Sequence, residues 1–399
     1  MKIMFAVASY WPSQDGVAHI TEYLAEGLAD RGHEVLVYTS AGNGGLQELP
    51  KYEDHRKVKI ERIRVYVRWP LKLKGRDRES TPKNYYNRIV TFQPDVLIVV
   101  CTQTWTFDWL KPYLNRIQCV KVFYSHGYSG WKDEYPLVEK LKKRNFLGVF
   151  EEWKKKRYYK DAVSIIKKYD LAVYLSEQNN AYIYARRNQL TNGMVLENAI
   201  ENRFFDKDMQ HGGKKRKAGE KVQFLYVANY NDNKNQSMLL QAYNSANIGE
   251  SRLVFAGFEE NEYLDSLRNQ QALSYYQMSK QVDFKVHLSR EEIYDLYRAS
   301  DVFVCASKAE TWSIVAHEAA ATGMPIISTD VGAISQIDGA LIVNNMEEMI
   351  KAIEFLYEQA EEREKRGQRA RAWVETRNCR ITDRVKLLED KLEQLCLEH

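Results

Sequence analysis

The chain has 399 residues, of which 44% are hydrophobic and 28% are charged. This length and composition predict a globular protein of two domains and exclude an intrinsically disordered chain. The formal net charge of +4 is unevenly distributed along the chain. Residues 1–205 carry 33 basic and 23 acidic side chains, whereas the remainder carries 25 basic and 31 acidic side chains. We therefore expect the N-terminal half to face an anionic surface or acceptor.

The first residues predict the start of an α/β fold. The apolar run 3–8 is typical of a buried strand rather than a secretory signal, and it is followed by a loop that ends at Gly16. An amphipathic helix over 17–28 and a second strand over 34–38 come next, which indicates a parallel sheet. Ligands of such folds bind beyond the carboxyl ends of the strands, so Gly16 is a candidate for close backbone approach to a ligand. A tight turn that needs glycine is the alternative.

Further strands are expected in the N-terminal half. One of them, 120–124, leads directly into His126 and Gly127, which places a histidine at the carboxyl end of a buried strand. Such a histidine can face a ligand, although a purely structural role is the alternative. The other predicted strands are 58–65, 95–100, 170–176 and 194–198.

Two N-terminal segments, 51–90 and 137–169, are strongly basic, and the second interleaves its charges with aromatic residues. A basic segment with aromatic residues can lie on anionic lipid, so we expect peripheral contact with a membrane. A solvated helix face is the alternative. Because no nucleic-acid-binding motif accompanies these segments, no nucleic-acid partner is expected.

The five cysteines are scattered, with no CxxC pair and no histidine at metal-ligand spacing. This pattern fits a reducing cytosol and argues against structural zinc. Asp206 and Asp208 stand close together, but they do not follow a buried strand and belong to a polar stretch, 206–221, that we interpret as the interdomain linker. No metal site and no cofactor are expected.

The second half repeats the α/β pattern and ends in an amphipathic helix over 380–396. A strand over 222–228 leads into a loop that contains Lys234, a natural partner for phosphate at the end of a strand. Plain surface exposure is the alternative for this lysine. The remaining predicted elements before the end are strands at 252–257, 282–288 and 301–306, and a helix at 291–299.

The stretch 308–325 is the most informative part of the chain. Glu310 lies in a loop after a buried strand, and a helix then opens with Thr311 or Ser313 as the expected cap. A helix N-terminus favours an anion, and a carboxylate beside it accepts hydroxyl groups, which together suit a nucleotide sugar. The alternative is that Glu310 caps the helix and Glu318 is a surface residue, but the apolar neighbours of Glu318 argue against it.

These residues resemble the GT-B glycosyltransferases, specifically the large retaining group called glycosyltransferase family 4, and the resemblance covers nearly the whole chain. Its most specific element is the pair of glutamates with seven residues between them, followed by a Gly-Met-Pro ending. The quoted motifs are Pro12-x3-Gly16, Arg31-Gly32-His33-Glu34-Val35, Asn198-Ala199-Ile200, the loop ending at Lys234, Glu310-x7-Glu318, the stretch 318–325, and Ser328-Thr329-Asp330-Val331-Gly332.

The resemblance implies an N-terminal acceptor-side Rossmann-like domain over 1–205 and a C-terminal nucleotide-sugar domain over 206–379, with the terminal helix 380–399 packing back on the first. The active site of the family is the cleft between them. The implied donor-binding and catalytic residues are Gly16 near the phosphates, His126 at the donor sugar, Lys234 on the diphosphate, Glu310 on the sugar hydroxyls, the backbone of Thr311, Trp312, Ser313 and Ile314 along the sugar and phosphate, and Glu318 on the ribose.

Two positions depart from the family pattern. Asn229 stands where the family usually has an arginine, so one positive charge on the diphosphate is absent, and Asp15 precedes Gly16 where many relatives have two glycines. The resemblance implies a metal-independent, retaining transfer of a hexose from a UDP-sugar, favoured over a GDP-sugar, to a glycan or lipid-linked acceptor of a bacterial envelope, at the inner face of the cell membrane.

Three other functions are weighed against this one. A nucleotide-sugar-binding protein with little or no activity is suggested by Asn229, and a GT-B sugar-nucleotide epimerase would share the architecture. The epimerase would need an acid/base pair rather than the ordered set of Lys234, Glu310 and Glu318. A dinucleotide oxidoreductase is disfavoured because no G-x-G-x-x-G follows the first strand.

Overall fold

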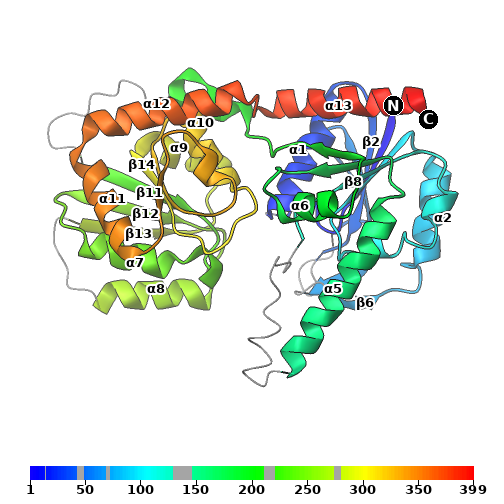
Figure 1. Ribbon diagram of the computed structural model, residues 1–399, viewed down its shortest axis with the longest axis horizontal. Helices are drawn as coiled ribbons and strands as arrows, with labels where there is room; N and C mark the ends of the chain where they lie inside the picture. Colours follow the sequence, from blue (N-terminus) through cyan, green and yellow to red (C-terminus); the bar gives the residue numbers. More distant parts are fainter. Residues whose placement is uncertain (14, 43–48, 69–71, 129–145, 211–220, 274–279) are drawn as a thin grey trace. The chain divides into compact units, whose positions relative to one another are not determined.

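The computed structural model describes the chain except residues 14, 43–48, 69–71, 129–145, 211–220 and 274–279 (Figure 1). The described residues form two compact units, one made of Met1–Glu197 with Thr382–His399 and one made of Asn198–Ile381. Each unit contains a sheet of mainly parallel strands and several helices, which confirms the predicted α/β class. No helix among the described residues has the length and apolar character needed to span a bilayer.

The first unit is built on an eight-stranded sheet with the order β10-β9-β8-β7-β1-β2-β4-β3, in which only β3 and β4 pair antiparallel. The central strands β7 and β8 are buried along their whole length, which explains their continuous apolar sequences. The strands are β1 (Lys2–Ala6), β2 (Glu34–Ser40), β3 (Tyr52–His55), β4 (Val58–Ile63), β7 (Val96–Val100), β8 (Val120–Tyr124), β9 (Leu171–Tyr174) and β10 (Gly193–Val195).

The strand predicted over 58–65 is divided into two. It forms β4 and then β5 (Val65–Arg68), which pairs with β6 (Lys72–Arg76) in a separate two-stranded sheet. The helices of this unit are α1 (Gly16–Asp30), α2 (Pro82–Phe92), α3 (Trp105–Asp108), α5 (Phe146–Ile166), α6 (Asn180–Arg187) and α13 (Ile381–Glu398), with a 3-10 turn η1 (Leu114–Arg116).

Helix α13 joins the first unit through a buried carboxylate. Glu389 accepts hydrogen bonds from Arg31 at 2.5 Å and from the Nε2 atom of His33 at 2.8 Å, where the chain leaves α1. Gly27 of α1 leaves room for Val385, whose Cγ2 atom would lie 2.4 Å from a Cβ atom at that position. The motif at 31–35 therefore holds α1, the start of β2 and α13 together.

The second unit contains a six-stranded parallel sheet with the order β13-β12-β11-β14-β15-β16. Helices α7, α8 and α11 pack along one side of this sheet and α9, α10 and α12 along the other (Figure 1). The strands are β11 (Val222–Val227), β12 (Ser251–Ala256), β13 (Lys280–Lys285), β14 (Val302–Cys305), β15 (Ile326–Thr329) and β16 (Leu341–Val343). The helices are α7 (Gln236–Ser245), α8 (Glu262–Leu273), α9 (Arg290–Ala299), α10 (Ile314–Thr322), α11 (Met346–Glu358) and α12 (Ala360–Thr376), with 3-10 turns η2 (Asn202–Phe205), η3 (Lys207–Met209), η4 (Asp232–Lys234) and η5 (Ile334–Gln336).

The predicted domain boundary at residue 205 differs from the structure by eight residues. Residues 198–205 belong to the second unit because Phe204 packs edge-on against Tyr294 and Tyr297 of α9. The predicted linker 206–221 begins with the η3 turn, in which Asp206 and Asp208 both pair with Arg203. The glycine pair and basic cluster of that linker lie outside the described residues.

Candidate functional site

Both sheets have a point from which successive strands are added in opposite directions. In the first unit this point lies between β1 and β7, and in the second it lies between β11 and β14. Loops at the carboxyl ends of two such strands diverge to opposite faces of the sheet and leave a crevice that binds ligands in α/β folds. Gly16 follows β1, Lys234 follows β11 and Glu310 follows β14, whereas His126 follows β8, the strand beside β7.

In the second unit, the loops after β11 and β14 bring Lys234 and Glu310 together. The Lys234 ammonium donates to the Oε1 atom of Glu310 at 2.5 Å, and the Ser307 hydroxyl donates to the same oxygen at 2.7 Å. Two further hydrogen bonds tie the loops to each other, from the Lys308 amide to the Asn233 carbonyl and from the Asn233 side chain to the Ala309 carbonyl. The pair is therefore held by backbone contacts as well as by its own charges.

The helix that follows, α10, begins one turn later than Thr311. Ser313 occupies the N-cap position with φ 68°, and its side chain makes no capping hydrogen bond. The prediction of Ser313 as the N-cap residue is therefore confirmed, but its hydroxyl makes no capping hydrogen bond to the first-turn N–H groups of α10. Ile314 is the first helical residue, so Glu318 lies about one turn inside the helix. Amides of this kind, at the positive end of the helix dipole, suit an anion.

Two features fix the loop in front of α10. Trp312 is buried and stacks on His317, with ring centroids 3.5 Å apart. Gly332 adopts φ 58°, and a Cβ atom there would lie 3.1 Å from the Cβ atom of Glu310 and 3.2 Å from the Trp312 amide nitrogen. The glycine that ends the motif at 328–332 therefore allows the Glu310 loop to pack closely.

Glu318 is 2% exposed, so the interpretation as a surface residue is wrong. Its carboxylate accepts from Arg290 at 2.6 Å and from the Tyr297 hydroxyl at 3.0 Å, which explains how a charge is tolerated beside alanines. Arg290 also pairs with Glu201 at 2.5 Å. Arg290 could not be recognised as this partner before the structure, because its neighbours Ser289 and Glu292 indicate only a helix start.

Asn229 lies on the exposed rim of the same region. Its carbonyl accepts from the Gln236 side chain at 3.0 Å, and the residue itself is exposed. Among the described residues near this loop, Lys308 pairs with Asp232 at 2.7 Å. The second unit thus brings Lys234, Glu310 and the start of α10 together, with Glu318 held separately by Arg290 and Tyr297.

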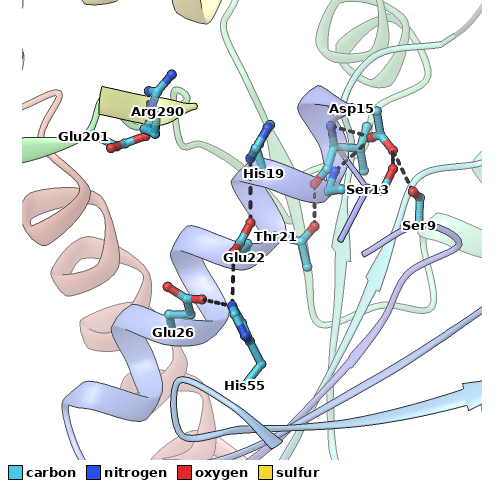
Figure 2. A network of polar contacts seen from close by, with 12 residues as sticks. Ser9, Ser13, Asp15, His19, Thr21, Glu22, Glu26, His55, Glu201 and Arg290 are labelled. Atoms are coloured by element: carbon cyan, nitrogen blue, oxygen red, sulfur yellow. Dashed lines mark hydrogen bonds and ion pairs between the residues drawn. The ribbon is translucent and has the colours of Figure 1, made fainter. Parts of the chain in front are cut away.

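In the first unit, Asp15 and Gly16 begin α1 after β1. The Asp15 carboxylate caps the helix by accepting from the amides of Val17 and Ala18, and it also accepts from the hydroxyls of Ser9 at 2.6 Å and Ser13 at 2.8 Å (Figure 2). Gly16 is the first helical residue, and a Cβ atom there would meet no atom within 4 Å. A tight turn therefore does not explain this glycine.

His126 follows β8 next to Cys101, which ends β7 with φ 64°. Burial lowers the pKa of His126 from 6.5 to about 4, although the Asp15 carboxylate acts in the opposite direction. Its Nε2 atom is buried and has no hydrogen-bond partner among the described residues. The imidazole is thus neutral at physiological pH, and its unpaired nitrogen is available to a ligand. Asp15 and Cys101 were not predicted as neighbours of His126, because only the strand order places them there.

Solved structures share the fold of this chain over its whole length. Sucrose-phosphate synthase from Thermosynechococcus elongatus superimposes with a TM-score of 0.73, 15% identity and 100% coverage of both chains. HepE from Anabaena, in complex with UDP and glucose, superimposes with a TM-score of 0.71 and 14% identity. The match covers 99% of this chain and 100% of HepE. WaaG, a glycosyltransferase involved in lipopolysaccharide biosynthesis, superimposes with a TM-score of 0.63 and 15% identity. The match covers 98% of this chain and 99% of WaaG. The chain therefore has the GT-B fold that the sequence predicted.

Family models identify both halves of the chain. Residues 14–186 match the model described as Glycosyltransferase Family 4, and residues 209–373 match the model described as Glycosyl transferases group 1. Both models describe glycosyltransferases, so the chain belongs to the glycosyltransferases and is a transferase, as predicted, rather than an epimerase. No curated protein sequence matches it significantly.

Gly16→Ala separates a ligand-binding role from a role in folding. Because the added methyl group meets no protein atom and alanine is the better helix former, we expect unchanged or slightly higher thermal stability. If the glycine admits a nucleotide sugar, affinity for the donor falls at least about tenfold, equivalent to roughly 1.4 kcal/mol. Calorimetric titration and thermal unfolding measure the two effects. Normal donor affinity would exclude the predicted role.

His126 predicts a pH dependence of stability. Its pKa falls from 6.5 to about 4 on folding, so the unfolded chain binds more protons between these values and stability is lost as the pH falls through this range. The full difference between the two pKa values corresponds to a change of about 3 kcal/mol in the free energy of unfolding. Urea unfolding at pH 7.5 and 4.5 should show a loss for the native chain that is about 2 to 3 kcal/mol larger than the loss for His126→Asn. Equal losses would contradict the assignment.

Proposed function

We propose that the chain is a metal-independent retaining hexosyltransferase that takes its sugar from a nucleotide diphosphate donor, with UDP-sugars favoured over GDP-sugars. The observation that carries this proposal is the contact between Lys234 and Glu310 beside the uncapped start of α10. It combines a cation for a diphosphate, an acceptor for sugar hydroxyls and a set of backbone donors. The presence of UDP and glucose in the HepE structure supports the choice of donor.

The proposed reaction follows from where charge develops. As the anomeric C–O bond of the donor breaks, the diphosphate departs with the electron pair and the sugar gains oxocarbenium character. Lys234 and the first amides of α10 stabilise the departing charge. The acceptor hydroxyl attacks from the same face of the sugar and gives its proton to a leaving phosphate oxygen, so the anomeric configuration is kept.

The other predicted residues take their roles within the same proposal. Glu310 accepts from sugar hydroxyls, and the backbone from Thr311 to Ile314 follows the sugar and phosphate. Glu318, already oriented by Arg290 and Tyr297, accepts from the ribose hydroxyls. Gly16 and His126 keep the roles at the phosphates and donor sugar that the family resemblance implies. Arg290, which holds the Glu318 carboxylate in place, adds a positioning residue to this set.

We also propose a glycan or lipid-linked acceptor in bacterial envelope or capsule polysaccharide synthesis, with the enzyme at the cytoplasmic face of the membrane. The involvement of WaaG in lipopolysaccharide biosynthesis supports this acceptor class. Helix α5 supports the membrane contact because Phe150 and Trp153 are both 51% exposed and stack 6.1 Å apart. Lys154 lies over the Phe150 ring and Arg157 over the Trp153 ring.

The two basic segments differ in what they offer to a membrane. In the described part of 51–90, several cations are already paired on the protein surface, as Lys57 is with Asp30 and Lys59 with Glu34. Residues 137–145 of the second segment lie outside the described residues. The membrane proposal therefore rests on the exposed aromatic and basic side chains of α5.

Glu310→Gln tests the donor assignment. The amide keeps the shape of the side chain but loses the charge that orients Lys234 and accepts from sugar hydroxyls. We expect kcat/KM for transfer from a UDP-sugar to fall about 100-fold or more, while the Kd for free UDP changes less than about threefold. The measurements are donor hydrolysis or transfer rates and calorimetric titration with UDP.

The matched control is Asp232→Asn, which removes a carboxylate from an adjacent loop at a side chain that is 83% exposed. We expect this control to retain near-native rates. Equal loss of UDP binding and transfer in Glu310→Gln, or loss of neither, would refute the assignment. Nucleotide binding without turnover of any donor in the native chain would refute the hexosyltransferase proposal itself.

Phe150→Ser/Trp153→Ser tests membrane contact. We expect the native chain to sediment with vesicles that contain anionic lipid, less so as salt rises, because the attraction is partly electrostatic. The double variant should bind at least about fivefold more weakly, since it removes two exposed aromatic side chains that would insert into the bilayer. Phe355→Ser, which alters an exposed aromatic residue of the second unit, is the control. Equal sedimentation of all three would contradict the α5 assignment.

A further inference from the structure

A cluster of histidines and glutamates lies on the first unit, between α1 and the β3–β4 hairpin (Figure 2). Glu22 and Glu26 are four residues apart on α1 and so share one face of the helix. His55 is the last residue of β3 and points at both carboxylates. One ligand atom from each of the three side chains lies within 4.8 Å of the other two.

The distances within this cluster are too long for hydrogen bonds but match the spacing of metal ligands. The Nε2 atom of His55 lies 3.4 Å from the Oε1 atom of Glu26 and 3.6 Å from the Oε1 atom of Glu22. Hydrogen bonds between such groups span about 2.7 to 3.2 Å. Ligand atoms at 2.0 to 2.2 Å from a tetrahedral zinc ion are separated by about 3.3 to 3.6 Å.

Three buried polar atoms at this place have no hydrogen-bond partner among the described residues. They are the Oε1 atom of Glu26, the Nε2 atom of His55 and the hydroxyl of Tyr10. Tyr10 is only 4% exposed, and it precedes Trp11, whose ring stacks on His55. Buried polar atoms nearly always have a closer partner than the 3.4 Å ion pair that joins Glu26 to His55, so the space between these two side chains indicates a ligand that binds there.

The surrounding residues orient the three ligands as an outer shell would. Arg56 donates to the other oxygen of Glu26 at 3.1 Å, and His19 lies near the other oxygen of Glu22 at 3.7 Å, an ion-pair distance without a hydrogen bond. The His55 ring stacks on Trp11 with centroids 4.3 Å apart, which fixes the plane of the imidazole.

A second group in the same unit shows what an ordinary ion pair looks like here. His33, Glu389 and Glu393 also lie close together, but the Nε2 atom of His33 is 2.8 Å from Glu389, and its Nδ1 atom is 3.1 Å from the amino group of Met1. Every contact of His33 is therefore a hydrogen bond of ordinary length. This group needs no metal to explain its geometry.

We propose that Glu22, Glu26 and His55 bind one zinc ion, and that this ion fastens the β3–β4 hairpin and the Trp11 loop to α1. This differs from the expectation of no metal, because the sequence separates His55 from the α1 carboxylates and only the fold brings them together. One imidazole and two carboxylates suit zinc, with the fourth position left for water beside the Tyr10 hydroxyl. The ion supports the loop that leads to Gly16 and takes no part in the proposed sugar transfer.

The test is zinc binding by the full chain after treatment with a chelator. We expect one zinc ion per chain in competition with a chromophoric chelator, and an absorption spectrum of tetrahedral type when cobalt replaces zinc. His55→Gln and Glu26→Gln should each weaken zinc binding at least about 100-fold, and His19→Asn about tenfold, because outer-shell partners contribute less than ligands. Added zinc should raise the thermal midpoint of the native chain but not of the ligand variants.

Glu393→Gln is the matched control, because it removes a carboxylate from the second group and leaves the proposed ligands intact. Its zinc affinity should equal that of the native chain. If His55→Gln does not fold, Glu26→Gln provides the same comparison, because it also removes one proposed ligand. Zinc binding by the native chain no tighter than by Glu26→Gln, or an equal loss in Glu393→Gln, would overturn the proposal. Because zinc binding is measured without substrate, its failure would leave the proposed transferase function untouched.

Discussion

A parallel sheet that grows in both directions from its middle must send two neighbouring loops to opposite faces, and this constraint decides where chemistry can occur in both units. In the second unit it places the loop after β11 next to the loop after β14, and the hydrogen bond from Lys308 to Asn233 joins them. The ion pair of Lys234 and Glu310 depends on that junction. Since strand order fixes the pair, residues 76 positions apart meet without any local sequence signal.

Buried charge is handled differently at the two glutamates of the main motif. Glu310 is held by a lysine that a ligand phosphate can also attract, so its partner can be shared during binding. Glu318 is deeply buried and held by Arg290 and Tyr297, which leaves it oriented before any ligand arrives. Desolvated carboxylates need partners of this kind, and a fixed partner reduces the ordering required on binding. The two glutamates are therefore suited to different tasks despite their common motif.

The sequence predicted the fold and much of the candidate site because both depend on local patterns. Buried apolar runs identified most strands. Lys234 and Glu310 could be found because each directly follows a predicted strand. The partners of Glu318 could not be found, since Arg290 looks like any charged residue at a helix start. His55 is a similar case, because a histidine at the end of a short hairpin strand carries no sign of the helix it faces.

The first unit is discontinuous in the chain, and this has a consequence for how the protein is made. Residues 382–399 leave the ribosome after the whole second unit, yet they provide the Glu389 carboxylate that Arg31 and His33 need. The N-terminal segments of the first unit are synthesised first, but the unit can fold completely only after α13 has been synthesised. The second unit is contiguous over Asn198–Ile381, so its core can form earlier. Until then Gly27 and its neighbours on α1 present a surface that a chaperone can shield.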